Sequence, residues 1–289
     1  MELRSLRAFV EVAKRGGFTA AAEQLSLTQS AVSKLVARLE EELGCPLFQR
    51  HRHQAELTDG GRVVLQYAEK MLSSAADIAQ ALSDLDDLQR GELRIGIPPL
   101  GPGLFVPQIR EFKRRYPNIE LKLFEDGSHA IAQALTNGQL DLGGLLAPLD
   151  DARFEHRMLI DDKLVLLAPA KSYWAKRDEV KLRELAEEPF ILFPPAYALN
   201  DRIIEACHQQ SFTPQVVGRS GQISFIMEMV RHGIGITLLP SSTLNQVDRR
   251  AFSICTLAPQ IPWRIDLAWV RGSFMSAAAR GWLATLIPQ

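Results

Sequence analysis

Apolar residues between positions 29 and 43 recur three and four residues apart, the spacing that gives an α-helix one buried face. The apolar positions are Val32, Leu35, Val36, Leu39 and Leu43. The opposite face carries small, polar or basic residues, namely Gln29, Ser30, Ser33, Lys34, Ala37 and Arg38. Acidic residues occur only at its far end, at positions 40–42. We therefore predict an amphipathic helix whose slim, mildly basic outer face suits the DNA major groove.

A second short helix is predicted just before it, over residues 18–25. Ala20, Ala21 and Ala22 are small enough to let two helices approach closely, and Leu25 completes the apolar contact. Thr28 is a typical N-cap for the following helix. The pair resembles a helix-turn-helix, although a corner between two helices in an enzyme would give a similar pattern.

The following residues favour the DNA interpretation. Gly44 is placed to end the recognition helix, and an Arg- and His-rich segment follows at positions 50–53. This order predicts a winged helix-turn-helix whose wing lies along the DNA backbone, with Arg50 and Arg52 on phosphates. Thr28 is expected to contact a phosphate or to cap its helix.

A long helix is predicted from residue 59 to residue 89. Its apolar residues alternate in steps of four and three, at Val64, Ala68, Met71, Ala75, Ile78, Leu82 and Leu85. That is the heptad seam of a coiled coil, about 45 Å long at about 1.5 Å per residue. A helix that packs on its own domain would also be amphipathic, but its run is usually shorter and its apolar stripe wider. We therefore predict that this linker helix forms a dimer.

Strand and helix patterns alternate beyond residue 90. Strands are expected near 93–97, 120–124, 140–146, 162–169, 190–193, 215–219, 234–239 and 265–270, with a closing helix at 276–287. Alternation of this kind predicts parallel α/β sheets. We expect two lobes with a ligand cleft between them, lobe I at about 90–161 plus 265–289 and lobe II at about 162–264.

Ligands of open α/β sheets bind beyond the carboxyl ends of strands, where helix N-termini attract anions. That rule selects Leu100, Gly101, Ser128, Tyr197 and Gln222 as candidate ligand contacts. A small carboxylate is the expected ligand class, with Arg202 and Arg219 as candidate clamps. Each position also has a purely structural explanation, as a turn, a helix cap, surface packing or a helix start.

Composition narrows the choice of function without deciding it. The formal net charge is -1 over 289 residues, so any attraction to nucleic acid must come from local charge. No secretory signal or membrane-length apolar run is visible in the sequence. Cys45, Cys207 and Cys255 are odd in number and far apart, which fits a reducing cytoplasm better than a redox sensor.

Rival classes lack the residues that they need. Gly233 and Gly235 precede a strand, and no third glycine follows at the spacing of a dinucleotide loop. The G-x-S-x-G nucleophile elbow is also absent. His51 and His53 lie in the basic wing, where phosphate contact is a simpler explanation than a metal site. We therefore expect no catalytic residues, metal or cofactor. A secreted solute-binding protein would share the lobes but not the helix-turn-helix.

The first sixty residues resemble the LysR-type transcriptional regulators. The matching positions are Phe9, Val12, Gly17, Phe18, Ala21, Ala22, Leu25, Thr28, Gln29, Ala31, Val32, Ser33, Leu39, Glu40, Leu43, Gly44, Leu47, Phe48, Arg50, Leu57, Thr58 and Gly60. Ser30 and Lys34 depart from the family pattern, which bears on base preference. Looser matches follow at Tyr116-Pro117, 138–141, Phe212-Thr213-Pro214 and 230–240.

This resemblance implies a winged helix-turn-helix domain at 1–58, a dimerising linker at 59–89 and a periplasmic-binding-protein-like effector domain at 90–289. It also implies a double-stranded operator with an interrupted inverted repeat, a small-molecule effector, and assembly into dimers and tetramers. The candidate ligand contacts match, by loose alignment, positions that face the effector in related regulators.

Overall fold

The computed structural model describes residues 1–49, 55–83, 91–100, 102–244, 247–248 and 250–286. The chain divides into two compact units. One comprises Met1–Asp87 with Thr136–Gln139, and the other comprises Leu88–Leu135 with Leu140–Gln289. Each unit has its own hydrophobic core and is described by itself.

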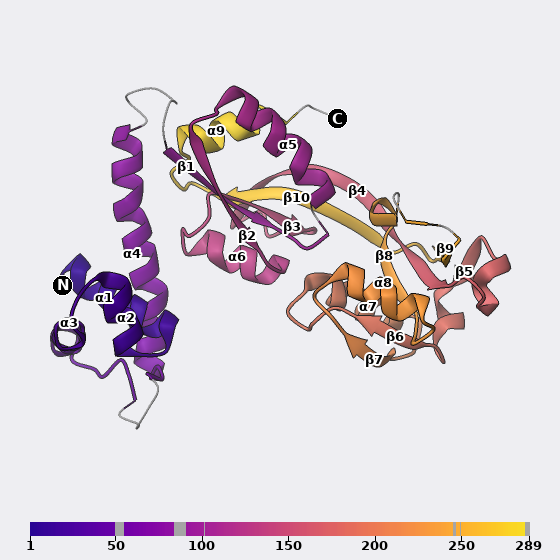
Figure 1. Ribbon diagram of the computed structural model, residues 1–289, viewed down its shortest axis with the longest axis horizontal. Coiled ribbons are helices and arrows are strands. Elements are labelled where there is room, and N and C mark those ends of the chain that lie inside the picture. The colour runs from indigo at the N-terminus through magenta and orange to yellow at the C-terminus, as the bar shows by residue number, and fades with distance from the viewer. Residues whose placement is uncertain (50–54, 84–90, 101, 245–246, 249, 287–289) are drawn as a thin grey trace. The chain divides into compact units, whose positions relative to one another are not determined.

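The first unit is built from four helices (Figure 1). They are α1 (Leu3–Arg15), α2 (Phe18–Leu25), α3 (Gln29–Leu43) and α4 (Asp59–Ser83). Apolar side chains from all four helices form one core, in which the Phe48 ring lies 5.4 Å from that of Phe9 and 5.6 Å from that of Phe18. The predicted helix-turn-helix is therefore a packed domain of its own.

The sequence signals for helix ends are confirmed. The Thr28 hydroxyl accepts a hydrogen bond from the Ala31 N–H at 3.2 Å, which caps α3. Gly44 ends α3 with φ of 68°, a left-handed conformation that glycine adopts without strain. Thr58 caps α4 by accepting from the Gly61 N–H at 2.9 Å.

The base of the wing is ordered by a residue whose role the sequence did not reveal. Phe48 and Leu57 form an isolated antiparallel bridge, and the Glu40 carboxylate accepts from the Leu47 N–H at 2.6 Å. Glu40 therefore joins the recognition helix to the wing. The predicted phosphate contacts Arg50 and Arg52 lie outside the described residues.

Gly61 marks a close approach between the start of α4 and the chain before the wing. A Cβ atom at Gly61 would lie 2.1 Å from the Leu47 carbonyl oxygen, whereas one at Gly60 would meet nothing nearer than 3.5 Å. We expect Gly61→Ala to destabilise the first unit by about 1–3 kcal/mol, because the backbone must shift to admit the methyl group. Gly60→Ala is the matched control and should leave the melting temperature unchanged or raised. Equal melting temperatures for the two variants, measured by circular dichroism, would contradict this account.

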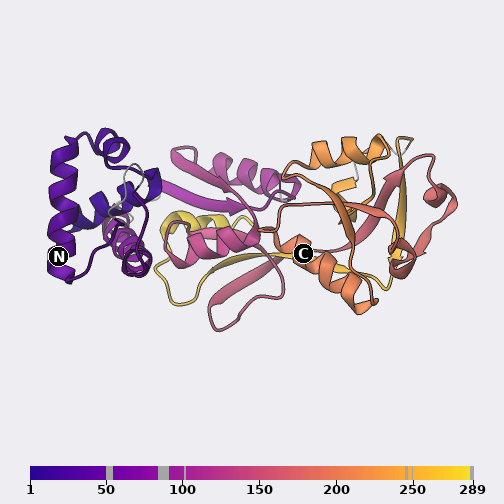
Figure 2. The same cartoon turned by 90° about the horizontal axis from the view of Figure 1, so that it is seen from below.

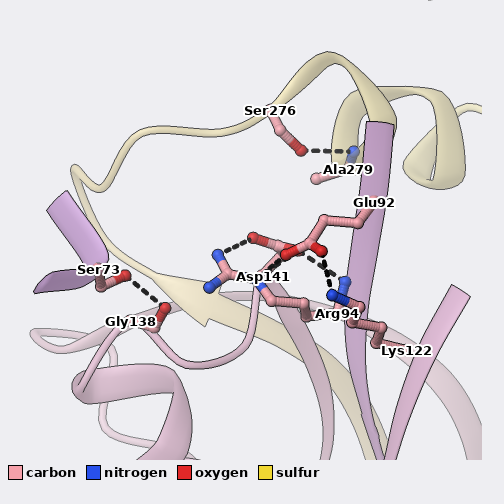
Figure 3. A network of polar contacts seen from close by, with 8 residues as sticks. All are labelled: Ser73, Glu92, Arg94, Lys122, Gly138, Asp141, Ser276 and Ala279. Carbon is pink, nitrogen blue, oxygen red and sulfur yellow. Dashed lines mark hydrogen bonds and ion pairs between the residues drawn. The ribbon is translucent and has the colours of Figure 1, made fainter. Parts of the chain in front are cut away.

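The short segment Thr136–Gln139 groups with the first unit. The Ser73 hydroxyl donates to the Gly138 carbonyl at 2.5 Å (Figure 3). The Glu69 carboxylate accepts from the side-chain amides of Asn137, at 2.8 Å, and Gln139, at 2.6 Å. Ser73 and Glu69, two polar residues of α4, therefore hold the segment Thr136–Gln139.

The second unit contains a mixed eight-stranded sheet and a two-stranded sheet. The large sheet is formed by β1 (Gly91–Ile97), β2 (Ile119–Glu125), β3 (Leu142–Leu146), β4 (Phe154–Pro169), β5 (Glu179–Lys181), β8 (Thr237–Pro240), β9 (Phe252–Ala258) and β10 (Pro262–Val270). The small sheet pairs β6 (Pro189–Leu192) with β7 (Gln215–Arg219). The helices are α5 (Pro102–Arg115), α6 (Ser128–Thr136), α7 (Ala198–Gln209), α8 (Ile223–Arg231) and α9 (Ala277–Leu283).

The prediction of purely parallel sheets was wrong. β1 pairs in parallel with β2 and β3, but β10 runs antiparallel to both β3 and β4. The predicted strand at 162–169 begins earlier, at Phe154, because its first half pairs with β10. Strands β5 and β9 were not predicted from the sequence.

Two groups of cores correspond to two lobes. Around β1 and β3, α5 and α9 cover one face of the sheet and α6 covers the other (Figure 1). The core of the second lobe includes side chains from β6, α7 and α8. β4 takes part in both lobes, because its first half pairs with β10 and its second half with β8 and β9; Figure 2 shows the same fold from below.

A bidentate ion pair fixes the start of the first lobe. The Arg94 guanidinium donates to Asp141 at 2.7 Å, and the Arg94 backbone N–H donates to the other oxygen of that carboxylate, also at 2.7 Å (Figure 3). Neighbouring Lys122 and Glu92 form a second pair across β1 and β2. Asp141 thereby holds the chain entering β3 beside β1, which gives the loosely matched segment 138–141 a structural role.

Candidate functional sites

The outer face of α3 is exposed in the way that the sequence predicted. Val32, Val36 and Leu39 are buried, whereas the candidate DNA contacts on this helix are all exposed, at Gln29, Ser30, Ser33, Lys34 and Arg38. Leu43 was placed in the buried stripe, yet it is 39% exposed, because the helix ends there at the Gly44 turn. The helix therefore presents a small, exposed polar surface.

The cations on this face differ in availability. Lys34 makes no ion pair within the described part of the chain. The Arg38 guanidinium lies 3.0 Å from Glu2 and 3.4 Å from Glu42, and Glu42 also pairs with the N-terminal amine at 2.8 Å. These partners lower the pKa of Glu42, with the hydrogen bond from the amine as the largest favourable cause. Arg38 must leave two carboxylates to reach a phosphate, so Lys34 is the better placed cation.

At the N-terminus of α3, Thr28 caps the helix through its hydroxyl group. Its hydroxyl lies 3.1 Å from that of Ser30 while it accepts the Ala31 N–H. Both hydroxyls are exposed, so they remain able to meet a phosphate from the same position. The cap and the phosphate contact were alternatives for Thr28 in the sequence, and the cap is present.

The apolar seam on α4 divides into two parts. Ala68 is 1% exposed and Val64 packs beside it in the core of the first unit, so these two side chains already have partners. Met71 and Ile78 are 41% and 64% exposed, and Val63 and Tyr67 are exposed as well. The side chain of Leu82 and all of Leu85 lie outside the described residues. The outward apolar stripe therefore begins at Val63 and Tyr67, one position before the predicted seam.

A cavity lies between the lobes of the second unit. Three of the predicted ligand contacts line it: Leu100 after β1, Ser128 at the start of α6 and Tyr197 before α7. The other lining residues were not singled out from the sequence, namely Pro98, Pro99, Gly127, Leu146, Phe193, Ala198, Leu199, Trp263 and Ile265. Gly101 lies outside the described residues. Gln222 is exposed at the start of α8 and does not line the cavity.

The two lobes touch beside this cavity at Gly127. A Cβ atom there would lie 2.9 Å from the Ala196 carbonyl oxygen and 3.4 Å from Cα of Tyr197. Glycine is therefore required for the close approach of the two backbones. The Ser128 hydroxyl accepts the Leu146 N–H at 3.1 Å, which joins α6 to the end of β3.

The back of the cavity is held by polar contacts on the other face of β10. Trp263 and Ile265 point into the cavity, and the alternate residues Arg264 and Asp266 form an ion pair at 2.6 Å. Asp266 is fully buried and also contacts His156 Nδ1 at 2.7 Å. The hydrogen bond with Asp266 raises the pKa of Arg264. The contact between Asp266 on β10 and His156 on β4 fixes the two strands against each other and so helps to orient the two apolar side chains.

Neither candidate arginine clamp has its guanidinium group free to hold a ligand, because each already donates hydrogen bonds within the protein. Arg202 donates to the Ala147 carbonyl, and Arg219 donates to the Phe193 carbonyl at 2.8 Å and to the Asn200 amide oxygen at 3.0 Å. Both guanidinium groups thus stabilise the chain around the cavity. No charged side chain is found among the residues that line it within the described ranges.

The cysteines are free thiols, and two of them are poorly suited to redox chemistry. Burial raises the pKa of the Cys207 thiol to about 12 and also raises that of Cys255. The thiolate is the reactive form, and it is scarce at neutral pH when the pKa is raised. Among the described residues no group of three His, Cys, Asp or Glu is arranged to hold a metal ion. Nor does any helix in the part of the chain that the structure describes have the length and apolar character to cross a membrane.

Comparisons with known proteins identify the families to which the two parts of the chain are similar. Residues 3–62 match the family described as bacterial regulatory helix-turn-helix protein, lysR family, and residues 86–289 match the LysR substrate binding domain. The transcriptional regulator YwbI of Bacillus subtilis is 35% identical over 285 residues, 98% of this chain and 95% of that protein. The transcriptional dual regulator GltC of the same organism is 33% identical over 253 residues, 86% of this chain and 84% of that protein.

A solved structure extends the similarity to the whole fold. A variant of full-length OxyR from Pseudomonas aeruginosa superimposes with a TM-score of 0.72 at 26% identity, over 98% of this chain and 92% of that one. The two family matches together cover nearly all of the chain. The chain therefore belongs to the LysR family and is a DNA-binding transcriptional regulator with an effector-binding domain, not an enzyme.

Proposed function

We propose that this regulator binds an interrupted inverted repeat as a dimer. We also propose that a small molecule bound in the interlobe cavity changes the affinity of the regulator for this operator. The exposed polar face of α3 is the observation that carries the proposal. Val32, Val36 and Leu39 on its apolar face are buried in the first unit, whereas Ser33 and Lys34 make no side-chain contact that holds the fold in the described part of that unit. A helix of this kind reads bases from the major groove.

The dimer contact is proposed to be the outward apolar stripe of α4, formed by Val63, Tyr67, Met71, Ala75 and Ile78. This revises the heptad seam at its start, because Val64 and Ala68 pack inside the first unit. A stripe of this width on an exposed helix favours a helix partner. Two recognition helices joined in this way would meet two half-sites about one helical turn or more apart.

A tetramer needs a second contact, and the effector domain has apolar surface available for one. Leu123 and Phe124 are exposed on β2, the outer strand of the large sheet. Val106 on α5, Phe225 on α8 and Ile234 are also exposed. Exposed apolar groups of this size are typical of surfaces that bind another protein chain. We propose that they join dimers into tetramers.

The effector is proposed to bind among Leu100, Ser128 and Tyr197, between the lobes. Residues from both lobes line this cavity, so a ligand there would stabilise one arrangement of the lobes over another. A small carboxylate was expected because α6 begins at the cavity, but the lining supplies no cation for it.

The proposed function can be tested by selecting duplexes from a random library with the full-length protein. We expect the enriched sequences to contain two half-sites related by inversion and separated by a fixed spacer. A single asymmetric site, or enrichment without sequence preference, would contradict a dimeric reader of an inverted repeat. The same selection needs no knowledge of the target genes.

A further inference from the structure

This inference rests on the proposed effector site. The interlobe cavity that forms this site is small, and its lining residues are uncharged. The cavity itself measures only about 30 Å³, well below the usual range for ligand pockets of about 300–1,000 Å³, and it reaches about 340 Å³ only when the solvent at its open mouth is included, so a ligand would lie largely in the mouth. Its walls are aliphatic, aromatic or hydroxyl-bearing. A ligand of roughly one ring fits this space better than an extended one.

Aromatic side chains give the cavity a flat wall. The rings of Phe193 and Tyr197 are stacked, with centroids 5.5 Å apart and planes inclined by 27°. Trp263, on β10, is only 2% exposed and lines the same space. Offset stacking and edge contacts between rings add to the gain from apolar burial. The wall therefore selects a planar, apolar ring.

The local electrostatic field does not favour an anion. Asp126 lies directly before the cavity residues Gly127 and Ser128, and its carboxylate accepts the Gly127 N–H at 2.7 Å. Burial, and secondly the charge of Asp126, raise the pKa of Tyr197. This carboxylate offsets the positive end of α6, which was the reason to expect an anionic ligand.

Neither of the two candidate clamps is free to compensate a bound carboxylate. Arg219 is held by the Phe193 carbonyl and by the amide of Asn200, which is 3% exposed, and Arg202 is held by the Ala147 carbonyl. Moving the Arg219 guanidinium would leave buried acceptors at Phe193 and Asn200 without their donor, and moving that of Arg202 would leave the partly buried Ala147 carbonyl without its donor. An unpaired carboxylate in an apolar cavity is costly, so the charge would oppose binding.

The hydroxyl group of Ser128 can still orient a neutral ligand. Because the Ser128 oxygen accepts the Leu146 N–H, its own proton is available to donate. The Tyr197 hydroxyl makes no hydrogen bond to another residue within the described ranges. The Ser128 hydroxyl can donate to an acceptor on the ring, such as a carbonyl oxygen, whereas the Tyr197 hydroxyl lies beside Gly221, which is not among the residues that line the cavity.

We propose that the effector is a small, flat, uncharged aromatic molecule carrying one hydrogen-bond acceptor. This replaces the carboxylate suggested by the sequence. The ring lies against Phe193, Tyr197 and Trp263, and the acceptor meets Ser128.

Three probes of nearly equal shape test the proposal: benzamide, benzoate and benzamidinium. Isothermal titration of the full-length protein with each, at millimolar probe concentrations, should give benzamide a Kd at least tenfold below that of benzoate. Benzamidinium, which has the planar shape but no acceptor, should bind more weakly than benzamide. Equal or tighter binding of benzoate, or no binding of any probe, would overturn the proposal.

Substitutions separate the charge argument from the shape argument. Asp126→Asn should tighten benzoate binding several-fold and leave benzamide unchanged, whereas Asp248→Asn, at an exposed position, is the matched control and should change neither. Ser128→Ala should weaken benzamide binding several-fold, and it should also lower the melting temperature slightly, because the Leu146 N–H loses its acceptor. A benzoate Kd that is the same in Asp126→Asn and in the unsubstituted protein would show that the field of Asp126 does not set selectivity.

Operator binding by the same preparations distinguishes this inference from the proposed function. Benzamide binding without any change in affinity for a selected duplex would support the ligand class and contradict effector control. A duplex response to benzoate but not to benzamide would support effector control and overturn the ligand class.

Discussion

Replacing Met71 and Ile78 by aspartate is expected to convert dimers into monomers and to lower operator affinity by about a hundredfold or more. The two side chains are 41% and 64% exposed on the outward stripe of α4. In a paired helix each aspartate would lie in an apolar contact and near its copy, so burial and repulsion both oppose association. A monomer then loses the second half-site and the high effective concentration that the first one provides.

Analytical ultracentrifugation of Met71→Asp/Ile78→Asp, with fluorescence anisotropy on a selected duplex, checks both effects. Gln66→Asp/Ala76→Asp is the matched control, because these exposed positions of the same helix lie off the apolar stripe. It should remain dimeric and bind the duplex normally. Persistence of the dimer after substitution of Met71 and Ile78 would reject α4 as the contact.

The second large effect is expected at the outer face of α3. Ser33→Ala/Lys34→Ala should weaken binding to the selected operator by about 1–3 kcal/mol for each base contact that is lost. Because a dimer carries the substitutions in both subunits, binding is weakened at both half-sites. The fold should be unaffected, because neither side chain has a partner in the described part of the first unit. Arg38→Ala should cost less, since its guanidinium is already held by Glu2 and Glu42.

Fluorescence anisotropy at several salt concentrations measures this weakening. Lys171→Ala removes an exposed lysine of the effector domain and controls for the change in net charge. Affinity that falls equally in Lys171→Ala and Lys34→Ala would mean that only total charge matters. A larger fall in affinity in Arg38→Ala than in Lys34→Ala would contradict the order of availability derived from the ion pairs.

The helix-turn-helix was predictable because its signals are local. The spacing of Val32, Val36 and Leu39 defines a buried face. Thr28 and Gly44 lie just before and just after this stretch, and they define the two ends of α3. The close approach at Gly61 was not predictable, since Leu47 is distant from it in sequence and comes near it only in the folded domain.

Periodicity on α4 predicted a long helix but could not say what each apolar residue touches. Val64 and Ala68 continue the seam in sequence, yet the first unit covers them in space. A heptad pattern records which side of a helix is apolar, and the partner depends on tertiary structure. The same pattern therefore serves an internal core at one end and an exposed stripe at Met71 and Ile78.

The effector domain shows the limit imposed by sequence separation. Strand β10 lies beside β3 and β4 although a long stretch of chain separates Ile265 from Ile160, and no local pattern predicts that pairing. The rule for strand ends found Leu100, Ser128 and Tyr197, which follow predicted strands. It could not find Trp263, because that residue reaches the cavity from the early part of a strand that was predicted to begin later.

The central claim is that Ser33 and Lys34 read bases, and repeating the random-duplex selection with Ser33→Ala/Lys34→Ala tests it most directly. The account predicts that one or two base positions lose their preference symmetrically in both half-sites, while the spacing and the remaining positions are kept. An unchanged consensus, selected as strongly as by the unsubstituted protein, would contradict it.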